Sequence, residues 1–147
     1  TADVSVLVED VDLVAAVPAS LGVFVDLNPG MNRTGVPLDR LDVVAAIARG
    51  AGERFRGLHF YDGHLHGPDL EARRAEIFAG YERLLEVVAG LDLQGVRVAE
   101  VITAGTPRST TRCSLSGSPT CRSSTGSAQA RWSFTTRGPS SRTRTSP

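Results

Sequence analysis

The most informative absence in this sequence is lysine, because all 16 basic residues of the 147-residue chain are Arg. Only two Cys are present, too few for a disulfide-stabilised scaffold, and aromatic residues make up only 5% of the chain. No apolar run approaches the roughly 18 residues that a membrane span needs, and no charged-then-apolar leader opens the chain. We therefore expect a cytoplasmic globular protein with no membrane partner.

Acidic residues are absent from the last 40 positions. All 16 Asp and Glu lie in residues 1–107, which carry nine Arg and a formal charge of −7, whereas residues 108–147 carry seven Arg and a charge of +7. Ser, Thr and Arg supply 26 of those 40 residues. Such a segment cannot bury enough apolar surface to offset its chain entropy. We expect one folded domain over 1–107 and a disordered Ser/Thr/Arg-rich tail over 108–147.

The tail has two features that could suggest a binding role. Its Arg residues could contact phosphates, but Lys, Gly-Arg repeats and interleaved aromatic residues are missing, so we expect no nucleic-acid partner. Cys113 and Cys121 lack the paired spacing of a zinc site.

Residues 1–107 alternate between short β-branched runs and segments with helical spacing. Strands are predicted at 4–8, 23–25, 55–61 and 96–102, and helices at 11–21, 39–48 and 70–89, with Asp39 capping the second helix and Gly90 ending the third. This alternation implies an α/β protein with a parallel sheet, either open and doubly wound or part of a (β/α)8 barrel. No glycine-rich phosphate fingerprint follows the first strand, and polar clusters follow the other three, which favours a partial (β/α)8 barrel of about four strands with intervening helices.

The first polar cluster, DLNPGMNRTG at 26–35, places Arg33 between two glycines. Arg donates hydrogen bonds in a planar fork and suits an anionic oxygen, although a surface Arg in a turn would have the same spacing. The third cluster, TAGTP at 103–107, is a small-residue turn after a strand, which exposes backbone N–H groups to a phosphate. Turns of this composition are common in proteins.

The second cluster, GLHFYDGHLHG at 57–67, holds every His of the chain. His59 and Tyr61 lie on the same side of the predicted strand, where they would flank a flat ring or an anionic ligand, or simply pack in the barrel interior. A metal ion held by His64 and His66, as in a hydrolase barrel, is an alternative, but no further His exists to complete its ligands.

In this order, the three clusters resemble the D-threonine aldolase and D-serine dehydratase family of pyridoxal-phosphate enzymes, which has an alanine-racemase-like N-terminal barrel. The resemblance covers residues 1–107. It implies that Arg33 bonds the phenolic oxygen of the cofactor, that His59 and Tyr61 line its pyridine ring, that Gly105 and Thr106 bind its phosphate, and that His64 contacts the substrate. The implied reaction is retro-aldol cleavage of a D-β-hydroxy-α-amino acid such as D-threonine to glycine and an aldehyde.

The sequence departs from this family in ways that affect activity. The family attaches its cofactor through a Lys at the end of the first barrel strand, and this chain has none. We expect the piece carrying that Lys to lie upstream of Thr1, and the divalent metal to belong only to the intact parent with its C-terminal β domain. The chain alone is then an inactive fragment, whose open sheet edges favour poor solubility or a homodimer.

Three alternative hypotheses for the function remain open. A D-serine dehydratase or an amino-acid racemase of the same barrel class would fit the three clusters. A non-catalytic protein that binds pyridoxal phosphate, or an interaction protein, would need no Lys. A His-x-His hydrolase predicts stoichiometric zinc that is lost when His64 and His66 are changed.

The tail also fits a shifted reading frame. With G/C-rich codons, residues 126–137 read one frame away permit FSPGTVVVHDA, and residues 118–124 permit PDLPVE. Both resemble the continuation of this family, where a Ser-Pro-Gly-Thr segment opens the β domain. We expect residues 108–147 to be an out-of-frame tail that begins near Pro107.

Overall fold

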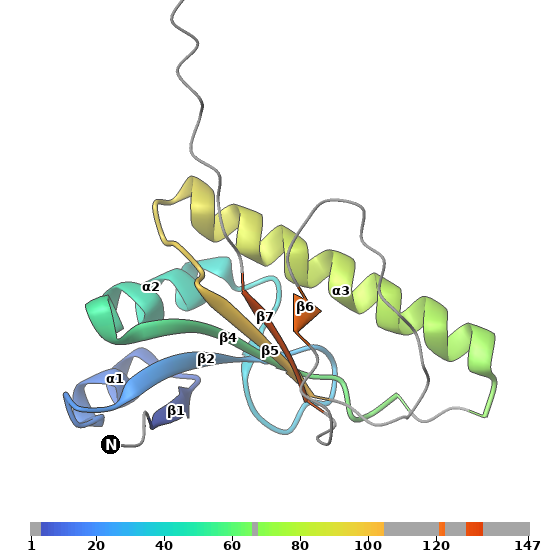
Figure 1. Ribbon diagram of the computed structural model, residues 1–147, viewed down its shortest axis with the longest axis horizontal. Helices are drawn as coiled ribbons and strands as arrows, with labels where there is room; N and C mark the ends of the chain where they lie inside the picture. The colour runs from blue at the N-terminus through green and yellow to red at the C-terminus, as the bar shows by residue number, and fades with distance from the viewer. Residues whose placement is uncertain (1–3, 66–67, 105–120, 123–128, 134–147) are drawn as a thin grey trace, which may run out of the picture.

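The computed structural model describes residues 4–65, 68–104, 121–122 and 129–133. Within these residues, seven strands form one sheet in the order β1-β2-β4-β5-β7-β6, with β3 paired to β2 (Figure 1). The strands are β1 (Ser5–Val8), β2 (Gly22–Asn28), β3 (Val36–Pro37), β4 (Phe55–Tyr61), β5 (Glu100–Ala104), β6 (Cys121–Arg122) and β7 (Gln129–Ser133). β1, β2, β4 and β5 run parallel, whereas β7 pairs antiparallel with β5, and β6 with β7.

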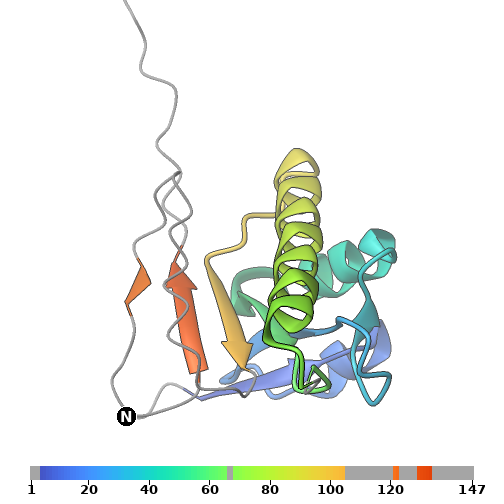
Figure 2. The same cartoon turned by 90° about the vertical axis from the view of Figure 1, so that its right-hand side faces the viewer.

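Helices connect the parallel strands and lie on one face of the sheet (Figure 2). α1 (Val11–Ala16) follows β1, α2 (Leu41–Ala51) and a 3-10 turn (Gly52–Arg54) precede β4, and α3 (Leu70–Leu93) leads towards β5. α1 packs against α2, and α2 against α3. A doubly wound sheet reverses its strand order and carries helices on both faces. The sequential parallel order with helices on one face is an arc of a (β/α)8 barrel, as predicted.

The hydrophobic core lies between the helices and the sheet. Its largest fully buried side chains come from three strands and two helices: Val23, Val25 and Leu27 of β2, Leu58 and Phe60 of β4, Val101 of β5, Val44 and Ile47 of α2, and Leu91 of α3. Because side chains alternate along a strand, the intervening residues of β2 and β4 face away from the helices. Asp26, His59 and Tyr61 are among those intervening residues, so the fold separates the apolar core from the polar candidates.

α1 is shorter than predicted. It begins after Asp10, whose carboxylate accepts a hydrogen bond from the Asp12 backbone N–H at 2.8 Å, and it ends at Ala16 rather than Leu21. The reason is Pro18, because the residue before a proline avoids the helical conformation. Val17 is accordingly extended, with φ −74° and ψ 124°.

The other two helices also differ from the prediction at their ends. α2 begins after Arg40, so the predicted cap at Asp39 is wrong. α3 begins as expected after Asp69 but continues through Gly90 to Leu93. Gly90 serves packing rather than termination, since a Cβ there would lie 2.6 Å from a methyl carbon of Leu41 on α2.

The last three strands of the chain, β5, β6 and β7, differ from the prediction. β5 starts at Glu100 instead of Val96, although Val96 and Val98 are buried. β7 and β6 lie in the segment expected to lack regular structure, where they continue the sheet beyond β5. The remainder of residues 108–147 lies outside the described residues, as do Gly105 and Thr106.

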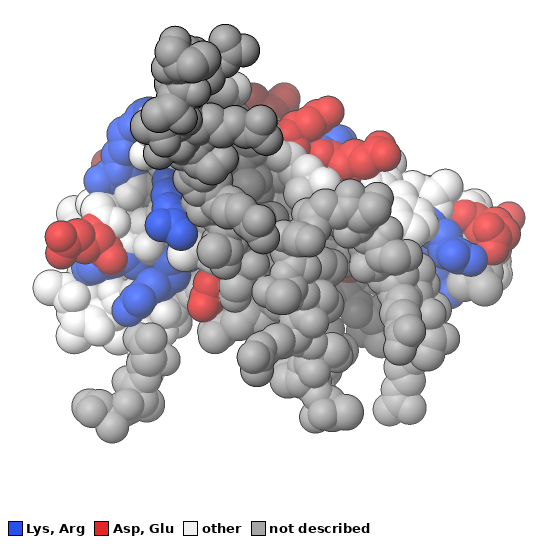
Figure 3. All heavy atoms as spheres, turned by 45° about the horizontal axis from the view of Figure 1, so that its top comes forward, with Lys and Arg blue, Asp and Glu red and all other residues white. Residues whose placement is uncertain are grey.

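Charged residues of both signs occupy the surface. Arg and Asp or Glu side chains both appear on the described part of the face in Figure 3. In the described part of the chain, none of the helices combines the length and the apolar character needed to cross a membrane.

Candidate functional site

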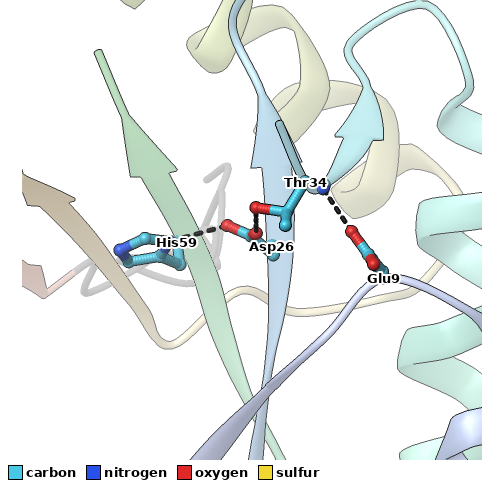
Figure 4. Close-up of polar contacts among 5 residues, drawn as sticks. Glu9, Asp26, Thr34 and His59 are labelled. Carbon is cyan, nitrogen blue, oxygen red and sulfur yellow. Dashed lines mark hydrogen bonds and ion pairs between the residues drawn. The ribbon is translucent and has the colours of Figure 1, made fainter. Parts of the chain in front are cut away.

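The carboxyl ends of β2 and β4 bring an acid and an imidazole together. Asp26 on β2 lies opposite His59 on β4 in the strand register. The His59 Nδ1 atom is 2.7 Å from Asp26 Oδ1, and the two side chains are only 18% and 12% exposed (Figure 4). Water therefore competes little for this hydrogen bond, and the pair is a fixed feature of the sheet face.

The loop after β2 is held in a tight turn by the side chain of Asn28. The side-chain oxygen of Asn28 accepts hydrogen bonds at 3.0 Å from the backbone N–H groups of Gly30 and Asn32. Gly35 has φ +96°, and a Cβ there would lie 2.7 Å from the carbonyl carbon of Leu27. Only glycine fits this conformation and this close approach, which explains the residue that follows Arg33 and Thr34.

Two carboxylates fasten the same loop to the strands. Thr34 Oγ1 donates to Asp26 Oδ2 at 2.9 Å, and the Gly35 backbone N–H donates to the Glu9 carboxylate (Figure 4). Asp26 thus uses both of its oxygens, one for Thr34 and one for His59. The loop that carries Arg33 and the strand that carries His59 share one anchor.

Arg33, His59 and Tyr61 meet at one cavity. The Arg33 guanidinium carbon lies 5.4 Å from the centre of the Tyr61 ring, within the range of a cation–π contact. The cavity has a volume of about 70 Å³, and its lining includes Leu7, Asp26, Arg33, Thr34, His59 and Tyr61. Three residues predicted from two separate clusters therefore line the same space on the face opposite the helices.

His64 lies elsewhere. It lines a second cavity of about 360 Å³ with Asp62 of the same loop and with Glu76 and Arg83 of α3. Its Nδ1 atom is buried without a hydrogen-bond partner among the described residues, and a Cβ on Gly30 would lie 3.2 Å from its Nε2 atom. The structure therefore does not bring His64 into the cavity of Arg33, and its predicted contact with a substrate stays a prediction.

Burial perturbs one acid at this second cavity. Removal from water raises the pKa of Asp62 above its ordinary value, while a hydrogen bond from its own backbone and the charge of His64 partly offset that rise. Asp62 is thus easier to protonate than an exposed carboxyl group.

Some residues of the predicted phosphate turn and of the alternative metal site are not among those that the structure describes. Gly105 and Thr106 lie outside the described residues, as does His66 of the His-x-His pair. In the described ranges, no group of three or more His, Cys, Asp or Glu could hold a metal ion.

Sequence reasoning assigned no role to Asp26, Thr34 or Glu9. In the sequence, Asp26 directly follows the apolar run at 23–25, near the carboxyl end of a strand where barrel enzymes carry their functional groups, and this position is a usable signal. Thr34 and Glu9 had no such signal, because their contacts depend on how the loop folds back on β2.

Comparison with known proteins shows the fold. No family model and no curated protein matches this sequence. An alanine racemase-like protein from Idiomarina loihiensis has a similar structure, with a TM-score of 0.58 and 17% identity. A mutant of D-threo-3-hydroxyaspartate dehydratase in its metal-free form has a TM-score of 0.56 and 22% identity.

Each similarity covers 65% of this chain and 28% of the other protein. This chain therefore spans little more than a quarter of either protein. Its fold is part of an alanine-racemase-like barrel.

Proposed function

We propose that this chain carries the ring-binding part of the active site of a pyridoxal-phosphate-dependent lyase. The observation that supports the proposal is the meeting of Arg33, His59 and Tyr61 at one cavity at the carboxyl ends of β2 and β4. These are the residues that the family resemblance assigns to the cofactor. A barrel enzyme builds its active site at this end of its strands.

The residues fit the ring of the cofactor. Arg33 would hold the phenolic oxygen, because its charge is permanent and its donors form a planar fork. Tyr61 and His59 would flank the pyridine ring. When bound, the cofactor supplies an electron sink for the carbanion that forms at the α-carbon of the substrate.

The residues do not fit covalent attachment, and the chain alone is proposed to be inactive. No Lys occurs among the 147 residues, so no side-chain amine can bond to the aldehyde of the cofactor. The cavity of about 70 Å³ is also small for the whole cofactor, so the residues that line it would have to move apart for the ring to enter.

The proposed substrates are D-β-hydroxy-α-amino acids such as D-threonine, cleaved to glycine and an aldehyde. Dehydration to a 2-oxo acid and ammonia is the second candidate. It is favoured by the structural similarity to D-threo-3-hydroxyaspartate dehydratase, whose name specifies a D-3-hydroxy amino acid. With D-threonine, a complete enzyme would give glycine and acetaldehyde in the first case, and 2-oxobutanoate and ammonia in the second. A divalent metal is proposed only for the intact parent.

The cofactor site can be tested by giving this chain the amine that it lacks. Leu7 on β1 lines the cavity with Arg33 and is 50% exposed, so Leu7→Lys would place an amine beside the bound ring. We expect pyridoxal phosphate and borohydride to leave a stoichiometric adduct at residue 7 of this variant. The unsubstituted chain should show no adduct at an internal position. Peptide mass spectrometry locates the adduct and separates it from labelling of the terminal amine.

Two controls make this test specific. Leu13 lies on α1, away from the cavity, and is 49% exposed, about as much as Leu7. Leu13→Lys should therefore react only as slowly as a free lysine. Adding Arg33→Gln to Leu7→Lys should reduce the adduct about tenfold, as expected for loss of one charged hydrogen bond. Equal labelling of residues 7 and 13, unaffected by Arg33→Gln, would contradict the proposed site.

A further inference from the structure

We infer that Asp26 is the positioning residue of this site, because its two oxygens fix the imidazole of His59 and the loop that carries Arg33. The inference deepens the proposed function and rests on it only for the identity of the ligand. Asp26 is buried, with 8% of the whole residue exposed, and both of its carboxylate oxygens are in hydrogen-bond contact. The sequence clusters alone predict no positioning role for Asp26.

The contact with His59 selects one form of the imidazole. A carboxylate only accepts hydrogen bonds, so the bond of 2.7 Å requires a proton on His59 Nδ1. In the neutral ring, Nε2 then carries a lone pair. Figure 4 shows this second nitrogen turned away from Asp26. The site thus presents a hydrogen-bond acceptor at Nε2, which suits an N–H or O–H donor of a bound ligand.

The contact with Thr34 transmits the same constraint to the loop. Thr34 directly follows Arg33, and its hydroxyl donates to the second oxygen of Asp26 at 2.9 Å. The carboxylate cannot rotate towards His59 or away from it without breaking this bond. One acid therefore sets the geometry of two groups that are 26 positions apart in the sequence.

A strand irregularity makes this arrangement possible. The pairing of β2 with β4 shifts between Val23 and Phe24, so that Phe24 lies opposite Gly57 and Arg56 is passed over. Without this shift, Asp26 would lie opposite Leu58, whose side chain faces the core. The shift places the imidazole of His59 opposite the acid. Bulges of this kind re-aim side chains next to functional sites in other sheets.

The form of the imidazole can be measured directly in the unliganded chain. Nitrogen NMR of ¹⁵N-histidine protein distinguishes a proton on Nδ1 from one on Nε2, and the chain has only three His. The signals of His59 are identified as those lost in His59→Gln. We expect neutral His59 to carry its proton on Nδ1. A proton on Nε2 in the unsubstituted chain would overturn the inference, because the position of the proton is measured in the unsubstituted chain and a variant serves only to assign the signals.

Two substitutions separate positioning from mere stability. Asp26→Ala should move the His59 proton to Nε2, the form that free histidine prefers, while the signals of His64 keep their folded positions. Thr34→Val should leave the proton on Nδ1 but speed amide exchange in residues 30–35, because it frees the loop only. Thr34→Ser, which restores the hydroxyl, should return exchange to its original rate. An unchanged His59 proton in Asp26→Ala would contradict the inference.

The ligand test links the inference to the cofactor. Asp26→Ala added to Leu7→Lys should reduce the adduct with pyridoxal phosphate by about tenfold, through both His59 and Arg33. Adduct formation that is undiminished would overturn the link. If residue 7 gains no adduct in any variant while His59 keeps its proton on Nδ1, the proposed cofactor is wrong and the positioning role of Asp26 stands.

Discussion

Arg54 shows how one side chain stabilises the end of a helix. Its guanidinium donates to the backbone carbonyl oxygens of Val17 at 2.9 Å and Val14 at 3.3 Å at the end of α1, where the Val14 oxygen also accepts a longer bond of 3.4 Å from the Val17 N–H. Carbonyl oxygens at a helix C-terminus carry partial negative charge and are stabilised by a cation. The residue thus connects the start of β4 to the end of α1.

Replacement of Arg54 tests this role. Arg54→Gln should lower the free energy of unfolding by about 1.5–3 kcal/mol, the usual contribution of hydrogen bonds to a charged group. Urea unfolding followed by circular dichroism measures the change. Arg74→Gln is the matched control, because the Arg74 side chain is 43% exposed and pairs with Glu71 at 3.3 Å on the surface of the same helix, so its loss should cost less than about 0.5 kcal/mol. Equal losses in the two variants would contradict the role of Arg54.

Among the elements, β4 depends most on a single glycine. Gly57 has φ +158°, and a Cβ there would lie 1.8 Å from the carbonyl oxygen of Glu100 on β5. That oxygen belongs to the backbone of a paired strand and cannot rotate away as a side chain would. The close approach of β4 and β5 therefore requires glycine.

Substitution of this glycine should separate the two strands. Gly57→Ala is expected to lower the free energy of unfolding by more than about 3 kcal/mol, or to prevent folding, because backbone must move. Gly52→Ala is the control, since Gly52 has φ +56° but no atom within 4 Å of the added Cβ, and its cost should be about 1–2 kcal/mol. Thermal unfolding compares the two. A milder effect at Gly57 than at Gly52 would show that β4 and β5 are not so closely paired.

The elements show what the sequence could and could not predict. The bounds of β4 and the alternation of strands and helices follow from local patterns, and the structure confirms them. β3, only two residues long, has no pattern to detect. The predicted end of α3 at Gly90 was wrong, because a glycine needed for helix packing and a glycine that ends a helix look alike in sequence.

The candidate site could also be predicted only in part. Arg33, His59 and Tyr61 could be placed together because parallel strands end at one edge and side chains alternate along them. The pair of Asp26 and His59 could not, because it depends on the irregular register of β2 and β4. His64 lies in the second cavity because the chain turns after Tyr61 towards α3, and strand alternation does not predict the direction of that turn.

At the scale of the whole molecule, the two edges of the sheet differ. Beyond β5 the described sheet continues into β7 and β6, whereas β1 has no strand beyond it among the described residues. Large apolar side chains are exposed at this β1 edge and on the adjoining helix, namely Val4, Leu7, Val11 and Leu13, each at 42–50%. An unpaired edge with an apolar surface is a site for association between copies.

We therefore predict that the chain self-associates through β1 and α1. Sedimentation velocity over a range of concentrations should show dimers or larger species, and Leu13→Glu should weaken association about tenfold or more, since burying the new charge is costly. Leu93→Glu is the matched control, because Leu93 is 89% exposed at the far end of α3 and the same change there should leave association unaltered. A chain that remains monomeric at every concentration, or equal effects of the two substitutions, would contradict a β1 interface.

Because Leu7 lies at both this edge and the cofactor cavity, association and ring binding should also compete, so pyridoxal phosphate should shift the Leu7→Lys variant towards the monomer.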